Sequence, residues 1–300
     1  MAQKISIIIP TNGRTVCLKR LLDSLKKSVY KDMEIIVVND GGNLDRQELK
    51  NYDLVFINNS SNQGMAFSRN QGAKMARGEY VLFIDDDNVV EENMIPRLIK
   101  SLDDHQDLIA VGPVTYYLSA PEKIWFIGSN FNLTTSKPFF HKKPLEKQLL
   151  DKELFAVGNL HNCFMIRKNI ARQAEWFDEK MAMSGTEFDL FMRMKKLNRK
   201  YSLAINLNAS CYHDIPPREK DLFRSLGFNY PKRAYFFQRN RAILVAKHGN
   251  ICQKLLFAFI FYPIFLFGYS LFFIVRRRFD FLQNHLKATL DGYHYLLKQS

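Results

Sequence analysis

Short apolar runs alternate with helical patterns through the first hundred residues of this chain. Four runs are rich enough in β-branched residues to form buried strands: residues 5–9, 34–39, 54–57 and 80–84. The first run stops at Pro10, and helical spacing follows at residues 14–28 and again at 64–77, where Gly78 is placed to cap the helix. Strands that alternate with helices predict an α/β fold, with a mostly parallel central sheet flanked by helices.

Acidic residues follow two of these predicted strands. Asp85, Asp86 and Asp87 come directly after the fourth run, and Asp40 comes after the second. Ligands of parallel sheets bind beyond the carboxyl ends of the strands. Three adjacent carboxylates repel one another unless a cation compensates them, and Mg²⁺ or Mn²⁺ suits oxygen ligands. The alternatives are a solvated acidic turn that caps a helix beginning near Glu91, and an ordinary Asp-Gly-Gly turn at Asp40.

Two further motifs carry acid or imidazole groups. Thr186 and Asp189 match a capping box, which explains Asp189 structurally at the start of a helix over about 187–198. Glu187 then lies in the first turn, where the helix dipole favours its ionised form, and an ionised carboxylate can act as a general base. His213 follows a strand-like run. Such a histidine is usually structural, but beside an aspartate triplet it can complete a metal site and favours Mn²⁺ over Mg²⁺.

Several common enzyme motifs are missing from the sequence. It contains no G-x-G-x-x-G after a strand, no G-x-x-x-x-G-K-[ST] and no G-x-S-x-G. This argues against a dinucleotide oxidoreductase, a P-loop NTPase and an α/β-hydrolase. Beyond the first hundred residues the pattern is less regular, and we expect a strand near 108–116 and a long loop over 119–154.

The positive charge of the chain is concentrated at its C-terminal end. The formal net charge is +13, and residues 215–300 contain 14 Lys and Arg against 4 Asp and Glu. Residues 1–214 are nearly balanced, with 29 basic and 26 acidic side chains. Arg239 and Arg241 belong to a basic stretch interleaved with aromatic residues. Because an apolar segment follows it, lipid phosphates are favoured over nucleic acid as its partner.

That apolar segment, residues 255–275, contains no charged residue among its 21 positions. As a helix it would be about 31 Å long, close to the thickness of the hydrocarbon core of a bilayer. Basic residues flank both ends, which disfavours a single crossing. Pro263 and Gly268 could break it into a shallow hairpin, and residues 279–298 look amphipathic. We therefore expect a re-entrant or interfacial anchor, although a single pass stays open.

Cysteine usage and the N-terminus bear on the compartment. Cys17, Cys163, Cys211 and Cys252 are scattered without metal-ligand spacing, which suits a reducing environment. No signal peptide precedes the first strand-like run. The sequence therefore predicts a protein on the cytoplasmic face of the cell membrane.

Four motifs, in this order, give the chain a specific resemblance. Residues 6–14, 34–42, 62–73 and 83–87 together resemble the family 2 glycosyltransferases. The resemblance covers about residues 4–245 and is strongest through residue 100. It implies a GT-A nucleotide-diphospho-sugar transferase fold, an inverting reaction and a bound Mn²⁺ or Mg²⁺. We expect a catalytic domain over 1–230 and a helical, membrane-associated region over 231–300.

The resemblance also implies roles for individual residues. The base motif of the family usually reads Gly-Glu-Asp-x-Asp-Leu, whereas this chain has Thr186, Glu187 and Asp189 at the corresponding positions. Glu187 and Asp189 are therefore the catalytic candidates. The metal ligands would be Asp85, Asp87 and His213, and Arg239 and Arg241 would meet a phosphate of the acceptor or of a lipid. The nucleotide-binding residues would be Pro10, Thr11, Asn12, Arg14, Asp40, Asn62, Gly64, Arg69, Asp85 and Asp86.

These features predict the transfer of a sugar from a nucleoside-diphosphate sugar to a hydroxyl of a membrane-associated, polyprenyl-linked acceptor in the synthesis of a cell-surface glycan. A polyprenyl phosphate acceptor would need no base, because its oxygen is already anionic, so the carboxylate at Glu187 favours a hydroxyl. The alternatives are a polyprenyl-phosphate glycosyltransferase, a sugar nucleotidyltransferase and a non-catalytic, membrane-bound nucleotide-sugar binder.

Overall fold

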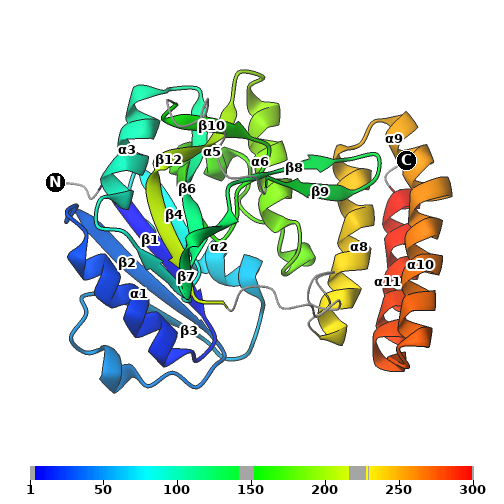
Figure 1. Cartoon of the computed structure of the whole chain (residues 1–300), viewed down its shortest axis with the longest axis horizontal. Coiled ribbons are helices and arrows are strands. Elements are labelled where there is room, and N and C mark those ends of the chain that lie inside the picture. The colour runs from blue at the N-terminus through cyan, green and yellow to red at the C-terminus, as the bar shows by residue number, and fades with distance from the viewer. Residues whose placement is uncertain (1–3, 142–151, 216–227, 229, 299–300) are drawn as a thin grey trace. The chain divides into compact units, whose positions relative to one another are not determined.

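A computed structural model describes residues 4–141, 152–215, 228 and 230–298 (Figure 1). The chain divides into two compact units. The first comprises Met1–Asn130, Phe140–Glu179 and Leu190–Pro217, and the second comprises Phe131–Phe139, Lys180–Asp189 and Arg218–Ser300. The division expected near residue 230 placed residues 131–139 and 180–189 in the catalytic domain, whereas here they pack with the C-terminal region.

A ten-stranded mixed sheet forms the centre of the first unit. Four parallel strands make up one half: β3 (Val55–Asn59), β2 (Met33–Asp40), β1 (Ile5–Thr11) and β4 (Tyr80–Ile84). Next to β4 the order continues with β11 (Cys163–Arg167), β6 (Leu108–Tyr117), β12 (Ser202–His213) and β10 (Leu154–Val157). β11 and β10 are antiparallel to their neighbours, while β6 and β12 are parallel to each other. The expected mostly parallel α/β sheet is confirmed.

Shorter strands extend this sheet. β5 (Asn88–Val90) pairs with β12 and β7 (Ala120–Phe126) pairs with β6, both antiparallel. A separate two-stranded sheet contains β8 (Ser129–Asn132) and β9 (Lys137–Phe140). The loop expected over 119–154 is therefore wrong for its described part, which contains β7, β8 and β9 and leads into β10. These strands are short and half exposed, so they lack the apolar runs that mark buried strands.

Helices cover both faces of the central sheet because its strands are apolar on both sides. In β1, Ile8 belongs to one apolar cluster while Ile7 and Ile9 belong to the other. The cluster of Ile8 includes residues of α2 (Met65–Met75), α5 (Lys168–Gln173) and α6 (Thr186–Leu197). The other includes residues of α1 (Thr15–Lys27), η1 (Arg46–Leu49) and α3 (Met94–Asp104).

Three local expectations about the ends of elements are wrong. Pro10 does not end β1, which continues to Thr11 with Pro10 opposite Val38. Gly78 does not cap α2, which ends at Met75 with Ala76 as its C-cap. Instead Gly78 passes close to β1, where a Cβ atom would lie 2.6 Å from the backbone nitrogen of Ser6. The helix expected to begin near Glu91 begins at Met94.

The second unit is largely helical. Its helices, among the described residues, include α8 (Pro231–His248), α9 (Ile251–Leu256), the π-helical turn η3 (Phe257–Phe261), α10 (Tyr262–Val275) and α11 (Phe279–Lys298). The 3₁₀ turn η2 (Glu179–Met181) begins at a residue of the first unit and ends in the second. Helices α8, α10 and α11 lie side by side (Figure 1). Their apolar core joins Ala242 and Val245 of α8 to Phe265 of α10 and Leu296 of α11.

The apolar segment is one helical stretch within this unit. Ile251–Val275 has a mean hydropathy of 2.1 and is, by length and composition, the one described helix that could cross a membrane. Pro263 follows the π-helical turn, which is consistent with the main-chain hydrogen bond that proline removes. The chain reverses between Val275 and Phe279, so the hairpin expected within 255–275 is formed instead by α10 and α11.

Candidate functional site

The predicted nucleotide-site residues of the first unit lie at the carboxyl ends of its parallel strands. Thr11 ends β1, Asp40 ends β2, and Asp85–Asp87 follow β4, which is between β1 and β11 in the sheet. Thr11 is buried opposite Asn39 of β2. The expectation that these side chains gather at one edge of the sheet is therefore confirmed by the strand order.

Arg14 connects two carboxylates at this edge. Asp86 is fully buried and accepts a 2.5 Å hydrogen bond from the Thr11 hydroxyl and a 3.1 Å hydrogen bond from Arg14 Nε. Burial raises the pKa of Asp86 to about 6, although Arg14 and Thr11 act in the opposite direction. Arg14 Nη1 also donates to Asp87 Oδ2 at 2.9 Å. The guanidinium thus neutralises much of the negative charge of the aspartate triplet.

Asp87 and His213 meet although 126 positions separate them in the chain. Antiparallel pairing of β12 with β5 places His213 opposite Asn88, and Asp87 Oδ1 lies 3.1 Å from His213 Nε2. Burial opposes the ionisation of Asp87, but His213 and Arg14 outweigh it and lower the pKa of this carboxyl. Among the described residues, the other ring nitrogen, His213 Nδ1, has no hydrogen-bond partner.

This pair fits two ligands of a divalent cation. Neighbouring ligands of an octahedral ion, each about 2.1 Å from the metal, lie about 3.0 Å apart. A carboxylate oxygen and an imidazole nitrogen also suit Mn²⁺. The third predicted ligand, Asp85, accepts a 3.0 Å hydrogen bond from buried Arg69. No group of three or more acidic, histidine or cysteine side chains within the described part of the chain is arranged to hold a metal. Metal binding by Asp85, Asp87 and His213 therefore stays a prediction.

Asp40 has a structural function in addition to the base-binding function expected of it. Its Oδ1 accepts hydrogen bonds from Asn59 Nδ2 and the Gln63 main-chain nitrogen, both at 2.9 Å, and its Oδ2 accepts one from the Gly64 nitrogen at 2.8 Å. It is 6% exposed. The carboxylate therefore fixes the segment that leads into α2. Base binding by Asp40 stays a prediction.

The other predicted nucleotide ligands lie around the same strand ends. Asn12 Nδ2 donates a 2.8 Å hydrogen bond to the Asp40 carbonyl, and Pro10 is buried within β1. Gly64 is the N-cap of α2 with φ +99°, and Asn62 is exposed just before it. Nucleotide binding by these residues stays a prediction.

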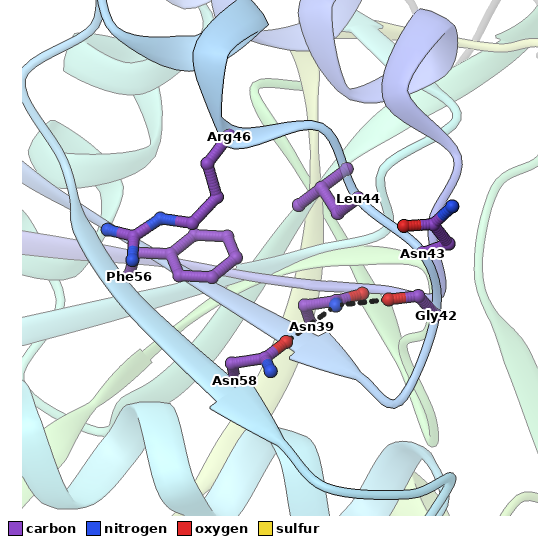
Figure 2. A pocket seen from close by; sticks show the side chains of 7 residues that line it. All are labelled: Asn39, Gly42, Asn43, Leu44, Arg46, Phe56 and Asn58. Carbon is purple, nitrogen blue, oxygen red and sulfur yellow. Dashed lines mark hydrogen bonds between the residues drawn. The ribbon is translucent and has the colours of Figure 1, made fainter.

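Sequence reasoning missed two features of this region. A hollow of about 220 Å³ lies beyond β2 and β3, where Arg46 covers the ring of Phe56 and the Asn39 amide donates to Gly42 and Asn58 (Figure 2). Its volume is below the usual range for a drug-sized ligand, so we assign no ligand to this hollow. Beside His213, the ring of Trp125 packs edge-on at 4.3 Å and stacks on His161 at 5.3 Å. No motif in the sequence marks these aromatic contacts.

Glu187 and Asp189 belong to the second unit, in the first turn of α6. The Thr186 hydroxyl donates a 2.9 Å hydrogen bond to Glu187 Oε2. Asp189 is fully buried, and its Oδ1 lies 2.7 Å from Lys247 Nζ and 2.8 Å from His248 Nε2. These partners on α8 are not the ones a capping box predicts for Asp189.

Arg239 and Arg241 are both engaged within the second unit. Arg239 lies over the rings of Tyr235 and Phe236 and donates to Asn240 Oδ1 at 2.9 Å. Arg241 is 6% exposed, and its guanidinium lies 4.0 Å from the ring centre of Phe265. Burial lowers the pKa of Arg241. The structure thus places Arg241 among aromatic rings, and phosphate binding by either arginine stays a prediction.

Comparison with known proteins gives consistent matches. The model of the glycosyl transferase family 2 matches residues 6–174. Glycosyltransferase GlyA of Streptococcus pneumoniae is 33% identical over 120 residues, which are 38% of this chain and 17% of that protein. A GalNAc(5)-diNAcBac-PP-undecaprenol beta-1,3-glucosyltransferase of Campylobacter jejuni is 33% identical over 104 residues, which are 32% of this chain and 34% of that protein. The chain thus spans about a third or less of the length of these two relatives.

A longer match and two solved structures agree with these relatives. An uncharacterised glycosyltransferase of Methanocaldococcus jannaschii is 26% identical over 229 residues, 73% of each chain. The structure of S. aureus TarS 1-349 with UDP-GlcNAc has a TM-score of 0.61 and 17% identity, covering 98% of this chain and 81% of that one. GalNAc-T7 with UDP, GalNAc and Mn²⁺ has a TM-score of 0.60 and 14% identity, covering 84% of this chain and 54% of that one. At these identities the two structures confirm the fold.

Proposed function

Because the chain belongs to glycosyltransferase family 2, we propose that it transfers a sugar, with inversion, from a nucleoside-diphosphate sugar to a hydroxyl of a lipid-linked acceptor at the cytoplasmic face of the cell membrane. The observation that carries the donor side of this proposal is the pair of Asp87 Oδ1 and His213 Nε2, which lie 3.1 Å apart beside Arg14. The relatives support a nucleotide-sugar donor, since TarS was solved with UDP-GlcNAc. The Campylobacter relative supports a lipid-linked acceptor.

The side chains at the strand ends suit a nucleoside diphosphate and a metal ion. Asp87 and His213 would hold Mn²⁺ or Mg²⁺, which when bound stabilises negative charge on the leaving diphosphate. Arg14, about half exposed, can turn its guanidinium toward an anion while Thr11 keeps its bond to Asp86. Arg69 is 1% exposed and orients Asp85. The protein thus supplies both a positive environment for the diphosphate and oriented carboxylates for the cation.

Glu187 is the general base in this proposal. It would accept the proton of the acceptor hydroxyl while that oxygen attacks the anomeric carbon from the face opposite the diphosphate. Its position in the first turn of a helix favours the carboxylate form, and the Thr186 hydroxyl fixes one of its oxygens. A phosphate acceptor would need no such group, so Glu187 distinguishes the two acceptor classes.

The test is the variant Glu187→Gln in the full-length protein. Donor binding, measured with UDP, GDP and dTDP in the presence of Mn²⁺, should stay as in the wild type. Transfer from the matching nucleotide sugar to a native lipid extract should fall by about 10²–10⁴-fold, because a positioned base contributes that much. Glu92→Gln, an exposed carboxylate before α3, serves as the matched control. Near-normal transfer by Glu187→Gln would favour the polyprenyl phosphate acceptor instead.

The membrane part of the proposal is an anchor that lies in the plane of the interface. The exposed residues between 255 and 275 are all apolar or glycine, and Ile260, Ile264, Phe267 and Leu271 follow one another at steps of three and four along one face. The opposite face is buried against α8 and α11, which carry charged side chains. A crossing would take those charges into the hydrocarbon, so one-sided contact with lipid is favoured.

A further inference from the structure

One face of α8 contacts the segment that carries Glu187. Asn240, Leu244 and the pair Lys247–His248 are spaced by three and four residues, so their side chains project from the same side of the helix. All of them contact residues between Met181 and Asp189, which belong to the same compact unit. We call these four residues of α8 the α8 cradle.

Asn240 fixes the start of this segment. It is 1% exposed, and its Nδ2 donates to the main-chain oxygens of Met181 at 2.7 Å and Ser184 at 2.8 Å. One amide group therefore holds two carbonyls, one on each side of the turn at Ala182, which has a φ of +57°. Removing that amide would leave the carbonyl of buried Met181 and that of partly buried Ser184 without this donor, which is costly.

Leu244 determines how closely the segment approaches α8. Gly185 has a φ of +77°, and a Cβ atom at this position would lie 2.9 Å from Leu244 Cδ1. The main chain therefore passes against the leucine side chain, immediately before the first turn of α6. A residue with a Cβ atom would be strained by the positive φ and would have to displace the leucine methyl group.

Lys247 and His248 fix the end of the segment. Both reach Oδ1 of Asp189, at 2.7 Å and 2.8 Å, and the side chains of Asp189 and His248 are 0% and 1% exposed. A fully buried carboxylate is tolerated only with such partners, and replacing a buried ion pair with apolar groups is often neutral for stability. The pair is therefore better explained by the geometry it imposes than by the stability it adds.

We propose that the α8 cradle positions Glu187 for proton transfer, so that Asn240, Leu244, Lys247 and His248 act on the reaction through the base-bearing turn. The proposal rests on the proposed role of Glu187 as the base. Glu187 lies between two fixed points, two residues after Gly185 and two residues before Asp189. Because a displacement of about 1 Å can reduce the rate about 10²-fold, fixing both flanks of the base is mechanistically significant.

The experiment compares substitutions along α8 in the full-length protein. Lys247→Met and His248→Leu each remove one partner of Asp189, and Lys232→Met makes the same lysine change at an exposed position of the same helix. The readouts are the kcat and KM of nucleotide-sugar hydrolysis, the Kd of the nucleoside diphosphate with Mn²⁺, and the thermal unfolding midpoint. We expect kcat to fall by about 10- to 100-fold in both cradle variants, with KM and Kd unchanged and Lys232→Met like the wild type. Because each cradle variant leaves the buried Asp189 with one partner fewer, the unfolding midpoint should also fall.

Conservative variants distinguish a loss of Glu187 positioning from a general loss of structure. His248→Gln keeps an N–H donor that can reach Asp189, and Lys247→Arg keeps a cation, so each should recover most of the lost kcat. They also keep the test decisive if His248→Leu fails to fold. Wild-type kcat in both cradle variants, alongside an inactive Glu187→Gln, would overturn the cradle and leave the proposed function intact. A loss of nucleotide affinity as large as the loss of kcat would also overturn it. An active Glu187→Gln variant would instead contradict the proposed role of Glu187 as the base, on which the cradle proposal rests.

Discussion

Both carboxylate oxygens of Asp40 accept hydrogen bonds from the segment that joins β3 to α2. The side chain is buried at the end of a strand, so these bonds replace the water that the ionised group would otherwise keep. A carboxylate has about four acceptor positions, and three are used here. The residue can therefore contact a nucleobase while also fixing the loop that surrounds it.

Asp40→Asn tests that combination of functions. The amide that replaces one oxygen cannot accept from the Gln63 or Gly64 nitrogens, so the variant should lose about 1–3 kcal/mol of stability as well as nucleotide affinity. The measurements are the denaturant midpoint and the Kd of the nucleoside diphosphate. Asp53→Asn makes the same change at an exposed position. A loss of affinity with an unchanged midpoint would show that Asp40 acts on the base alone.

His285 makes the stability of the helical unit depend on pH. It is fully buried on α11, facing Tyr269 of α10 and close to Arg241 of α8. Burial lowers its pKa from 6.5 to about 4, and the charge of Arg241 acts in the same direction. The unfolded chain therefore binds a proton between pH 6.5 and pH 4 that the folded chain does not, so stability falls as the pH falls through this range.

The corresponding prediction concerns how steeply the stability of the protein changes with pH. A shift of this size is equivalent to about 3 kcal/mol between pH 7 and pH 4. Unfolding midpoints of the wild type should decrease over this range, and His285→Gln should reduce the decrease whatever its effect at pH 7. The exposed His105, changed in the same way, should leave the slope as it is. An identical slope in His285→Gln would place the titrating group elsewhere.

Single residues also show which parts of the site could be predicted from the sequence and which could not. The aspartates at the strand ends could be predicted because each follows a recognisable buried run. The contact between Asp87 and His213 depends on the pairing of β12 with β5, a three-residue strand that has no apolar pattern of its own. No motif in the sequence connects Lys247 or His248 with Asp189, and only the packing of α8 on the 181–189 segment reveals their contact.

At the scale of elements, predictability follows burial. The strands β1, β2 and β4 are buried on both faces, so their sequences are continuous apolar runs, which predict strands from the sequence alone. In contrast, β7, β8 and β9 are partly exposed and mix aromatic, charged and polar residues. The structural role of a glycine was similarly hard to predict from the sequence. Gly78 was expected to end a helix, but it instead lets the main chain pass close to β1.

Two glycines inside helices should respond oppositely to the same substitution. Gly72 of α2 packs on β1, and a Cβ atom there would lie 2.5 Å from Ile8 Cγ2, so Gly72→Ala should destabilise the protein by about 1–3 kcal/mol. Gly268 of α10 has nothing within 4 Å of that position, so Gly268→Ala should stabilise by about 0.5–1 kcal/mol through helix propensity. Denaturant midpoints would check both, and equal shifts would contradict the packing explanation for Gly72.

For the whole molecule, the charge distribution agrees with the division into units. The net charge of +13 is carried mainly by the last 86 residues, while the sheet unit combines its carboxylates with arginines such as Arg14 and Arg69. Helix α8 contacts both the segment that carries Glu187 and the apolar helices of the same unit. One face holds the segment of Glu187, and another packs on the apolar helices through Ala242 and Val245. If both proposals hold, contact with lipid and the position of the base involve the same helix.

The exposed apolar face and its basic flanks predict how the full-length protein binds vesicles. Phe267 and Leu271 are 71% and 63% exposed, and Arg276–Arg278 follow the last residue of the same helix, Val275. Wild-type protein should sediment with phosphatidylcholine–phosphatidylglycerol vesicles, bind more weakly in high salt, and be released by alkaline carbonate, which leaves a spanning helix in place. Phe267→Ser with Leu271→Ser should abolish sedimentation, whereas Leu197→Ser, an exposed leucine of α6, should not. Retention after carbonate would show that the helix crosses the bilayer, and sedimentation of the double variant would move the contact to another surface.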